Sequence, residues 1–509
     1  MHAMGNGSAQ NGARGGERTP SVAIVGGGFG GIGAAVLLAR AGYRDVTVFE
    51  RGDRVGGVWA HNTYPGAACD VPSHLYEFSF EPNPRWSRRF SPQAEIQRYI
   101  EDVASRHGVL ERTRTNTEVT HAQWDEERCR WQLQTSAGPF EADILLTACG
   151  QLSIPKRPAI EGLESFAGPV FHTAEWDHDV DLAGRRVAVI GTGCSAIQAV
   201  PAIQPIAGHI DIYQRSPGWT IPKMDYEYSE RAKRLFERFP ALQRLDRIAT
   251  FVFMDVGAAA MTSQHWLLAP FRALARRQIE KAIHDDALRA RVTPTDEIGC
   301  KRLMLTDEWY PTLEKPNVEL LSDRIERVTP TGVLTDAGVE RAADVIVLAT
   351  GFDSHAFVAP MEVVGVGGRT LAQEWQPCAH AYLGLSVPGF PNMFLIYGPN
   401  TNGGTGSVIH VIEAGVAHVI DALRTLGRAR AARIEVRRER ADAFNRELRA
   451  ALAGTVWHTG CTSWYVDENG NDPNQWPWLW STYRRRTAHL EPGAYELTAR
   501  TAERALHAP

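Results

Sequence analysis

Two short apolar runs in this chain each end in a glycine-rich turn, and this repeated pattern restricts the fold more than any other feature. The first run, Ser21 to Val25, is rich in β-branched residues, as a buried parallel strand requires. It leads into Gly26, Gly28 and Gly31, spaced as G-x-G-x-x-G, and the residues from Ile32 to Arg40 favour a helix. This order predicts a dinucleotide-binding unit, because such glycines permit a tight turn, a close pyrophosphate and close helix packing.

The residue after the next predicted strand supports the same unit. That strand runs from Asp45 to Phe49, and Glu50 follows it. Glu50 lies about 20 residues beyond Gly31, the spacing at which a carboxylate holds the ribose hydroxyls of a dinucleotide.

The second apolar run, Val187 to Ile190, repeats the pattern with Gly191 and Gly193 as G-x-G-x-x-A. After the following strand, the position of the ribose carboxylate is taken by Arg215 and Ser216. A cation and a hydroxyl suit the 2′-phosphate of NADP, which an acid would repel. The second unit is therefore predicted to bind NADP.

The composition excludes several other classes of protein. A chain of 509 residues is long enough for two or three domains of roughly 150 residues each. A net charge of −5 gives no case for a nucleic-acid surface. No apolar run reaches about 18 residues, so no membrane span is predicted. We expect a cytoplasmic enzyme without a metal site.

Two further compositional points concern the cysteines and the first residues. The seven cysteines are scattered without a C-x-x-C pair, which indicates neither a disulfide framework nor a zinc site. Residues 1–20 are polar and lack the apolar core of a signal peptide, so we expect them to be disordered.

A segment between the two predicted units carries a third pattern. Phe166, Gly168, His172, Trp176 and Asp177 are spaced as F-x-G-x-x-x-H-x-x-x-W-D. This pattern resembles the fingerprint of the Baeyer–Villiger monooxygenases, flavoproteins that insert oxygen beside a ketone. The same pattern ending in Tyr or Phe is similar to their relatives that oxidise nitrogen and sulfur.

A second signature of that family resembles the stretch from Gly56 to Asp70. Gly57, Trp59 and Asp70 belong to G-G-x-W-x-x-x-x-Y-P-G-x-x-x-D. The resemblance implies a loop that lies over the flavin ring, with Asp70 as its one acid. An ordinary helix-capping carboxylate is the alternative for Asp70.

Further motifs with the same resemblance lie later in the chain. Lys301 and Arg302 begin a K-R block, and Trp464 lies in an S-W-Y element. The resemblance implies that Lys301 adds to the 2′-phosphate site and that Trp464 contacts bound NADP. Ordinary roles are also open: a solvated basic pair for Lys301 and Arg302, and core packing for Trp464.

The resemblance extends from Val22 to Tyr483 and implies an α/β fold of two Rossmann-like dinucleotide-binding domains. It implies a discontinuous FAD domain made of residues 21–150 and 354–509, the latter including a cofactor-contacting tail. An NADP domain, residues 151–353, is inserted between these parts. Within it, residues 226–292 are rich in helix formers and are expected to form a helical insertion.

The apolar part of this insertion runs from Ile248 to Met261 and has a second interpretation. It could touch a membrane surface. Asp255 in its middle and the absence of a basic face argue against that interpretation.

The chemistry implied by the resemblance depends on FAD, NADPH and O2. NADPH reduces FAD, the reduced flavin forms a flavin peroxide with O2, and its addition to a ketone leads to an ester or lactone. Arg302 is expected to stabilise the negative charge that develops, because arginine stays protonated and its planar fork can hold an oxyanion. Asp70 is expected to steer Arg302.

Three alternatives have different requirements. A flavin-containing monooxygenase that oxidises nitrogen or sulfur shares most motifs, but Trp176, Asp177 and Arg302 argue against it. A flavin disulfide reductase needs two close cysteines near the flavin, and a non-catalytic NADPH-binding regulator should lack a catalytic element. The 14 tryptophans and the helical insertion favour a bulky or lipophilic ketone, in a monomer or homodimer.

Overall fold

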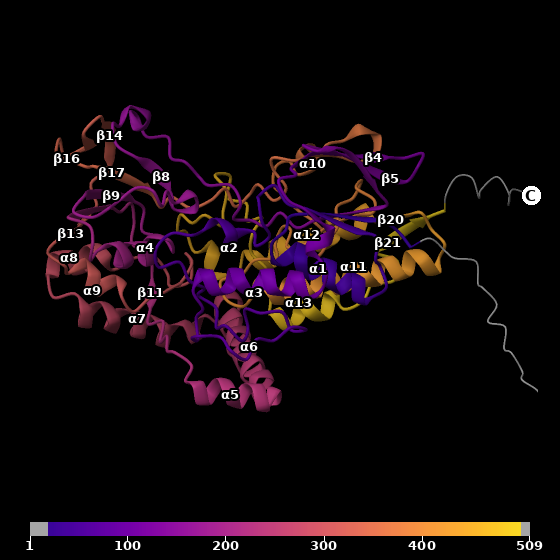
Figure 1. Ribbon diagram of the computed structural model, residues 1–509, viewed down its shortest axis with the longest axis horizontal. Coiled ribbons are helices and arrows are strands. Elements are labelled where there is room, and N and C mark those ends of the chain that lie inside the picture. The colour runs from indigo at the N-terminus through magenta and orange to yellow at the C-terminus, as the bar shows by residue number, and fades with distance from the viewer. Residues whose placement is uncertain (1–18, 500–509) are drawn as a thin grey trace, which may run out of the picture.

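A five-stranded parallel sheet forms the centre of each of two α/β lobes in the computed structural model, which describes residues 19–499 (Figure 1). The predicted fold class is therefore confirmed. We expected residues 1–20 to be disordered, and residues 1–18 of this stretch lie outside the described residues. Among the described residues, no helix combines the length and apolar character needed to cross a membrane.

The first sheet has the strand order β19-β7-β1-β2-β3. Its strands are β1 (Val22–Val25), β2 (Val46–Phe49), β3 (Thr113–Arg114), β7 (Ile144–Thr147) and β19 (Met393–Leu395). Strands β1 and β7 are fully buried, and alternate residues belong to two separate hydrophobic cores. This explains their uninterrupted apolar sequences, because both faces of the sheet are covered. Strand β19 joins from the last quarter of the chain, so distant segments build this lobe.

Helices pack around the first sheet. They are α1 (Phe29–Arg40), α2 (Val58–His61), α3 (Gln93–Arg106), α10 (Leu371–Glu374), α11 (Val408–Arg428), α12 (Arg438–Leu452) and α13 (Trp480–Thr487). Helix α1 begins three residues before the predicted start at Ile32, because it opens inside the glycine turn. The stretch from Gly56 to Gly66, expected to be a loop, contains the single turn α2, which begins after Gly57 at φ +58°.

The second sheet has the strand order β13-β10-β9-β17-β8. Its strands are β8 (Val170–His172), β9 (Arg186–Ile190), β10 (His209–Tyr213), β13 (Val318–Leu321) and β17 (Val345–Leu348), and α4 (Ala196–Ile203) and α9 (Trp309–Leu313) pack beside them. The segment that carries the fingerprint is therefore more than a connector, because part of it is the edge strand β8. Its last residue, His172, pairs with Leu348 of β17.

Smaller sheets extend both lobes. One contains β18 (Glu362–Val364), β4 (Val119–Asp125), β5 (Arg130–Thr135) and β6 (Gly138–Ala142), and another contains β14 (Ile325–Thr329), β15 (Gly332–Thr335) and β16 (Glu340–Ala342). Two strand pairs complete the set: β11 (Thr220–Ile221) with β12 (Met304–Leu305), and β20 (Arg433–Val436) with β21 (Tyr495–Thr498). Short 3-10 helices are η1 (Leu110–Arg112), η2 (Leu163–Ser165), η3 (Thr173–Glu175), η4 (His265–Leu268), η5 (Val366–Gly368) and η6 (Val456–His458).

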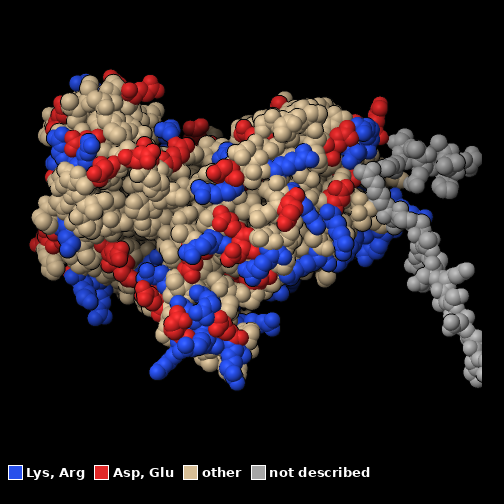
Figure 2. Space-filling view, viewed as in Figure 1, with Lys and Arg blue, Asp and Glu red and all other residues tan. Residues whose placement is uncertain are grey.

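The predicted helical insertion consists of α5 (Glu230–Arg238), α6 (Pro240–Thr262), η4, α7 (Ala269–Ala282) and α8 (Asp286–Val292). Its first two helices, α5 and α6, form the lower part of the molecule in Figure 1, while its last helix, α8, lies at the left beside the second lobe. Helix α5 and the start of α6 project beyond the two lobes, and Figure 2 shows Lys and Arg side chains at the tip and sides of this projection.

Candidate active site

A cleft of about 2270 Å³ lies where the two lobes meet and is lined by the glycine turns of both. Sites for a single small molecule usually have roughly 300–1,000 Å³, so this cleft has room for several ligands. Most of the predicted site residues line it: Gly26, Gly28, Glu50, Gly57, Trp59, Asp70, Gly191, Gly193, Arg215, Ser216, Lys301, Arg302 and Trp464. Gly31 and the fingerprint residues do not line it.

The first glycine turn has no space for side chains. A Cβ atom on Gly26, which has φ +111°, would lie 2.4 Å from the Ala148 carbonyl oxygen. A Cβ atom on Gly31 would lie 1.9 Å from the Gly26 carbonyl oxygen. Gly28 precedes α1, and no side chain of the described residues caps that helix start. The backbone N–H groups in the first turn of α1 are thus available to a phosphate, and this arrangement fits the pyrophosphate of FAD.

Glu50 is buried at the end of β2 and is held by the same turn. One carboxylate oxygen accepts a hydrogen bond from the Gly27 N–H at 2.7 Å, and the other accepts from the Gly52 N–H at 2.8 Å. Each oxygen keeps a further lone pair, so the carboxylate can also accept bonds from ribose hydroxyls. This donor and acceptor set fits the adenosine half of FAD.

The second glycine turn repeats the first. A Cβ atom on Gly191, at φ +110°, would lie 2.5 Å from the Ala349 carbonyl oxygen. This matches the close approach of Gly26 to the Ala148 carbonyl oxygen in the first turn. Gly193 faces open space, since a Cβ atom there would meet nothing within 4 Å. Both alanines begin the A-x-G segments that follow β7 and β17.

Three polar groups gather at the end of β10. Arg215 and Ser216 are exposed, and the Lys301 ammonium donates to the Ser216 hydroxyl at 3.1 Å. Lys301 also forms an ion pair with Asp296 at 2.5 Å. Two cations and a hydroxyl in one corner of the cleft fit a phosphate group on a bound NADP.

Arg302 and Asp70 are 232 residues apart in the sequence, and the fold brings them together. The Arg302 Nη2 donates to the Asp70 Oδ2 at 2.5 Å. Burial by itself would raise the pKa of Asp70, but the charge and hydrogen bond of Arg302, with Lys223, hold it below its usual range. The charge of Asp70 raises the pKa of Arg302. Both groups are therefore ionised near neutral pH, and both remain partly exposed to the cleft.

The first three fingerprint residues, Phe166, Gly168 and His172, lie in closely packed surroundings. Phe166 is buried in a core beside the second sheet, and a Cβ atom on Gly168 would lie 2.4 Å from the Asp344 carbonyl oxygen. His172 is buried at the end of β8, where its Nδ1 accepts from the Ala174 N–H at 3.1 Å.

The remaining features of the fingerprint connect this segment with its neighbours. The His172 ring meets the Phe352 ring edge to face at 5.7 Å, and burial lowers the pKa of His172. Trp176 packs beside a small cluster that includes Tyr64 of the first lobe. Asp177 is exposed and accepts from the Asp179 N–H at 3.0 Å, so it belongs to a surface turn.

A disulfide bond corrects the expectation for two of the cysteines. Cys300 and Cys461 are bonded, with their Cα atoms 6.2 Å apart and a sequence separation of 161. Because the two cysteines are so far apart, they form no spacing pattern that could be recognised in the sequence. The bond links the segment of Arg302 to the segment of Trp464. Neither cysteine is among the described residues that line the cleft, so this pair does not meet the requirement of a flavin disulfide reductase.

Two cleft residues, Gln198 and Lys223, were missed by sequence reasoning. Gln198 on α4 accepts from the Tyr64 hydroxyl at 2.8 Å and donates to the Ala68 carbonyl at 3.0 Å, which bridges the lobes. Lys223 adds positive charge beside Asp70. No motif marks either residue, because each acts through contacts with a distant segment.

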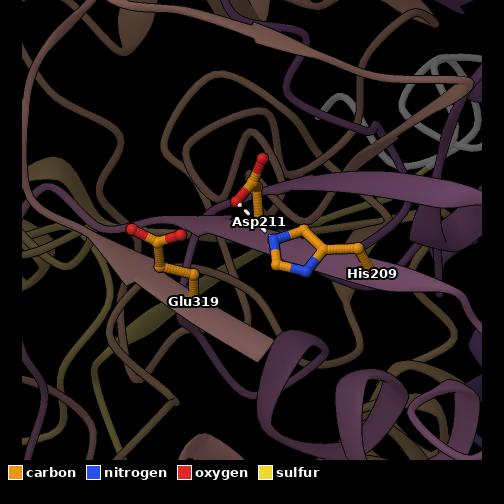
Figure 3. Close-up of side chains that lie close together, drawn as sticks. All are labelled: His209, Asp211 and Glu319. Atoms are coloured by element: carbon orange, nitrogen blue, oxygen red, sulfur yellow. Dashed lines mark hydrogen bonds and ion pairs between the residues drawn. The ribbon is translucent and has the colours of Figure 1, made fainter. Parts of the chain in front are cut away.

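A possible cation site lies away from the cleft (Figure 3). Ligand atoms of His209, Asp211 and Glu319 lie within 4.8 Å of one another on β10 and β13, and the site is empty. Arg341 donates to Glu319 at 2.5 and 2.7 Å and to Asp211 at 3.4 Å. We therefore describe these groups as an ion-pair network around Arg341.

Comparison with known proteins agrees with this geometry. A family model described as pyridine nucleotide-disulphide oxidoreductase matches residues 23–251. A Baeyer–Villiger monooxygenase of Streptomyces coelicolor is 42% identical over 94% of this chain and 92% of its own length. Another from Pseudomonas aeruginosa is 40% identical over 94% of this chain and 91% of its own length.

Two solved structures have the same fold. A steroid monooxygenase bound to NADP shares 31% identity with a TM-score of 0.85, over 94% of this chain and 99% of the other. A closed cyclohexanone monooxygenase shares 25% identity with a TM-score of 0.85, over the same shares of both chains.

Proposed function

Because the chain belongs to the Baeyer–Villiger monooxygenase family, we propose that its cleft oxygenates a bulky, lipophilic ketone. The enzyme depends on FAD and NADPH and converts a ketone to an ester or lactone with O2. When bound, the flavin supplies reducing equivalents from NADPH and the activation of dioxygen. The two glycine turns, Glu50 and the group around Arg215 are the residues that hold the two cofactors in this proposal.

The apolar wall of the cleft is the observation that carries the proposal. Side chains of α6, η4 and α7 contribute Phe253, Met254, Ala260, Met261, Leu268, Phe271 and Leu274 to the lining. Burial of apolar surface stabilises a bound ligand by about 25 cal/mol per Å², so this wall favours a large apolar substrate. The similarity to a steroid monooxygenase supports a polycyclic ketone, since the identity with it exceeds that with the cyclohexanone enzyme.

The ion pair of Arg302 and Asp70 supports the reaction type. Negative charge develops on the carbonyl oxygen of a ketone when oxygen is added to it, and a fixed cation stabilises that charge. Arg302 is permanently protonated and lies in the cleft, while Asp70 fixes the direction of its guanidinium group. In this assignment Arg302 is catalytic and Asp70 is a positioning residue.

A substrate panel tests the proposal. Purified enzyme is offered a steroid ketone, a long linear ketone, cyclohexanone and a thioether, and products are identified by mass spectrometry. We expect ester or lactone from the bulky ketones with a kcat/KM at least roughly tenfold above that for cyclohexanone, since burial of additional apolar groups contributes to binding. Preference for cyclohexanone contradicts the substrate class, and sulfoxide as the main product supports the nitrogen- and sulfur-oxidising alternative.

The preference for NADPH over NADH should depend on Arg215. Loss of a charge-assisted contact with phosphate costs roughly 1.5–3 kcal/mol, so Arg215→Ala should lower the ratio of kcat/KM for NADPH and NADH by about one to two decades. The ratio is measured from NAD(P)H consumption at saturating ketone. Arg185→Ala, which removes an exposed arginine before β9, is the matched control. Equal use of both coenzymes by the unmodified enzyme contradicts the assignment.

Oxygenation should suffer more than FAD binding in His172→Ala. His172 lies outside both glycine turns, yet it packs on Phe352 beside the A-T-G segment that leads away from the second sheet. Its loss should misplace the two lobes relative to one another, and small displacements reduce rates by roughly ten- to a hundredfold. The measurement compares flavin content with ester formed per NADPH consumed, and His489→Ala at an exposed site is the control. Simple loss of flavin from the His172 variant indicates a purely structural role.

A further inference from the structure

The outer face of the helical insertion is unusually apolar. Ten of the eighteen exposed large hydrophobic side chains among the described residues lie between Leu235 and Leu274. Soluble proteins expose single apolar residues widely, but a contiguous group of them marks an interaction site.

Helix α6 carries most of this surface. Six of its side chains are between 39% and 60% exposed, namely Leu242, Leu245, Ile248, Val252, Phe253 and Val256. At 100° per residue they fall within an arc of about 140° on one side of the helix. A surface helix usually turns its polar side to water, so this helix has the reverse orientation.

Three polar side chains of α6, those of Gln243, Arg247 and Asp255, form hydrogen bonds with the rest of the protein. Gln243 is buried and donates to Glu77 at 2.9 Å, and Arg247 donates to the His74 and Glu77 carbonyls at 3.0 and 2.9 Å. Asp255 accepts from the Trp480 N–H at 2.6 Å and from the Ser481 hydroxyl at 2.7 Å. Asp255 therefore caps α13 and leaves the outer face apolar, which removes one objection to a membrane role.

Basic side chains outnumber acidic ones in the helices that carry this apolar face, which weakens the other objection. From Glu230 to Ala282 the chain has ten Lys and Arg against five Asp and Glu, whereas the whole chain has 54 against 59. Exposed arginines include Arg231 on α5, Arg244 on α6 and Arg276 and Arg277 on α7. Figure 2 shows Lys and Arg side chains, with some Asp and Glu side chains among them, at this lower edge of the molecule. Exposed apolar side chains together with an excess of cations match the interface of a membrane with anionic lipids.

The same face borders the cleft. Ala249, Phe253 and Gly257 line it from α6, and the exposed Leu274 lines it from α7. An apolar surface thus continues from the outside of the protein to the wall of the cleft.

We propose that α5, α6 and α7 form a docking surface for an anionic lipid membrane, on which the enzyme lies without crossing it. The apolar stripe of α6 enters the boundary of headgroups and acyl chains, and the surrounding arginines bind the headgroups. Membrane docking is a property separate from ketone oxygenation, and it can be tested without knowing which ketone is the substrate.

Vesicle co-sedimentation of the FAD-loaded, full-length enzyme tests the proposal. We expect binding to vesicles of phosphatidylcholine with phosphatidylglycerol, weak binding to phosphatidylcholine alone, and loss of binding as salt rises. The double variant Leu245→Glu/Ile248→Glu should bind at least roughly tenfold more weakly, because it places charges in the apolar interface. Arg276→Glu/Arg277→Glu should lose binding to anionic vesicles.

Controls separate this proposal from its alternatives. Ile206→Glu changes a 53% exposed apolar side chain elsewhere and should bind vesicles like the unmodified enzyme. Turnover of a water-soluble ketone should be unchanged in the double variant, because Leu245 and Ile248 do not line the cleft. Absence of binding by the unmodified enzyme overturns the proposal. So does a dimer in light scattering that the double variant dissociates, since the face would then bind a second copy of the chain.

Discussion

Arg302→Ala should abolish most ester formation while the enzyme keeps FAD and continues to consume NADPH. The variant lacks the guanidinium group that Asp70 holds in the cleft, so negative charge on the carbonyl oxygen loses its positioned cation. Removal of one such group typically lowers rates by about 10²–10³-fold. Reducing equivalents should then appear as hydrogen peroxide. Ester, hydrogen peroxide and NADPH consumed are measured in one reaction.

Two further variants make this prediction specific. Asp70→Ala should slow flavin reduction as well, because it leaves the arginine without the carboxylate that directs it. Arg428→Ala on the surface of α11 should behave like the unmodified enzyme, since its side chain is 72% exposed and does not line the cleft. Ester formation at the normal rate by the Arg302 variant would overturn the assignment of this residue.

Gly31→Ala should yield folded protein that lacks flavin. The added methyl group would lie 1.9 Å from the Gly26 carbonyl oxygen, so the turn must change shape and move the N–H groups of α1. A pyrophosphate bound at a helix start depends on the directions of those groups. Flavin content is measured from visible absorbance after purification, and circular dichroism checks the fold.

A milder variant keeps this test informative if Gly31→Ala destabilises the lobe. Glu50→Gln removes a charged acceptor of the Gly27 N–H, and its FAD affinity should fall by roughly tenfold or more. Gly427→Ala within α11 is the matched control, because a Cβ atom there meets nothing within 4 Å. Full flavin content in both Gly31 and Glu50 variants would contradict the assignment of this turn to FAD.

Much of the fold could be predicted from the sequence because its signals are local. The strand before Gly26, the glycine spacing and the helix after it act within about twenty residues, as backbone sterics and apolar periodicity do. The same holds for the second turn at Gly191. Glu50, Arg215 and Ser216 could be predicted as cofactor-binding residues because they follow directly after such strands, whereas Asp70, Arg302 and Trp464 were predicted only from the family resemblance.

The tertiary structure alone decided that Cys300 and Cys461 meet across 161 positions of the sequence, and which face of α6 is outside. The contact of Asp70 with Arg302 was expected only from the family resemblance, because the packing of two lobes joins these residues across 232 positions and no local pattern records it. Asp255 argued against a surface role in the sequence, yet its partners lie on α13. Apolar periodicity shows that a helix has two sides, but only the contacts of its polar residues determine which side meets water.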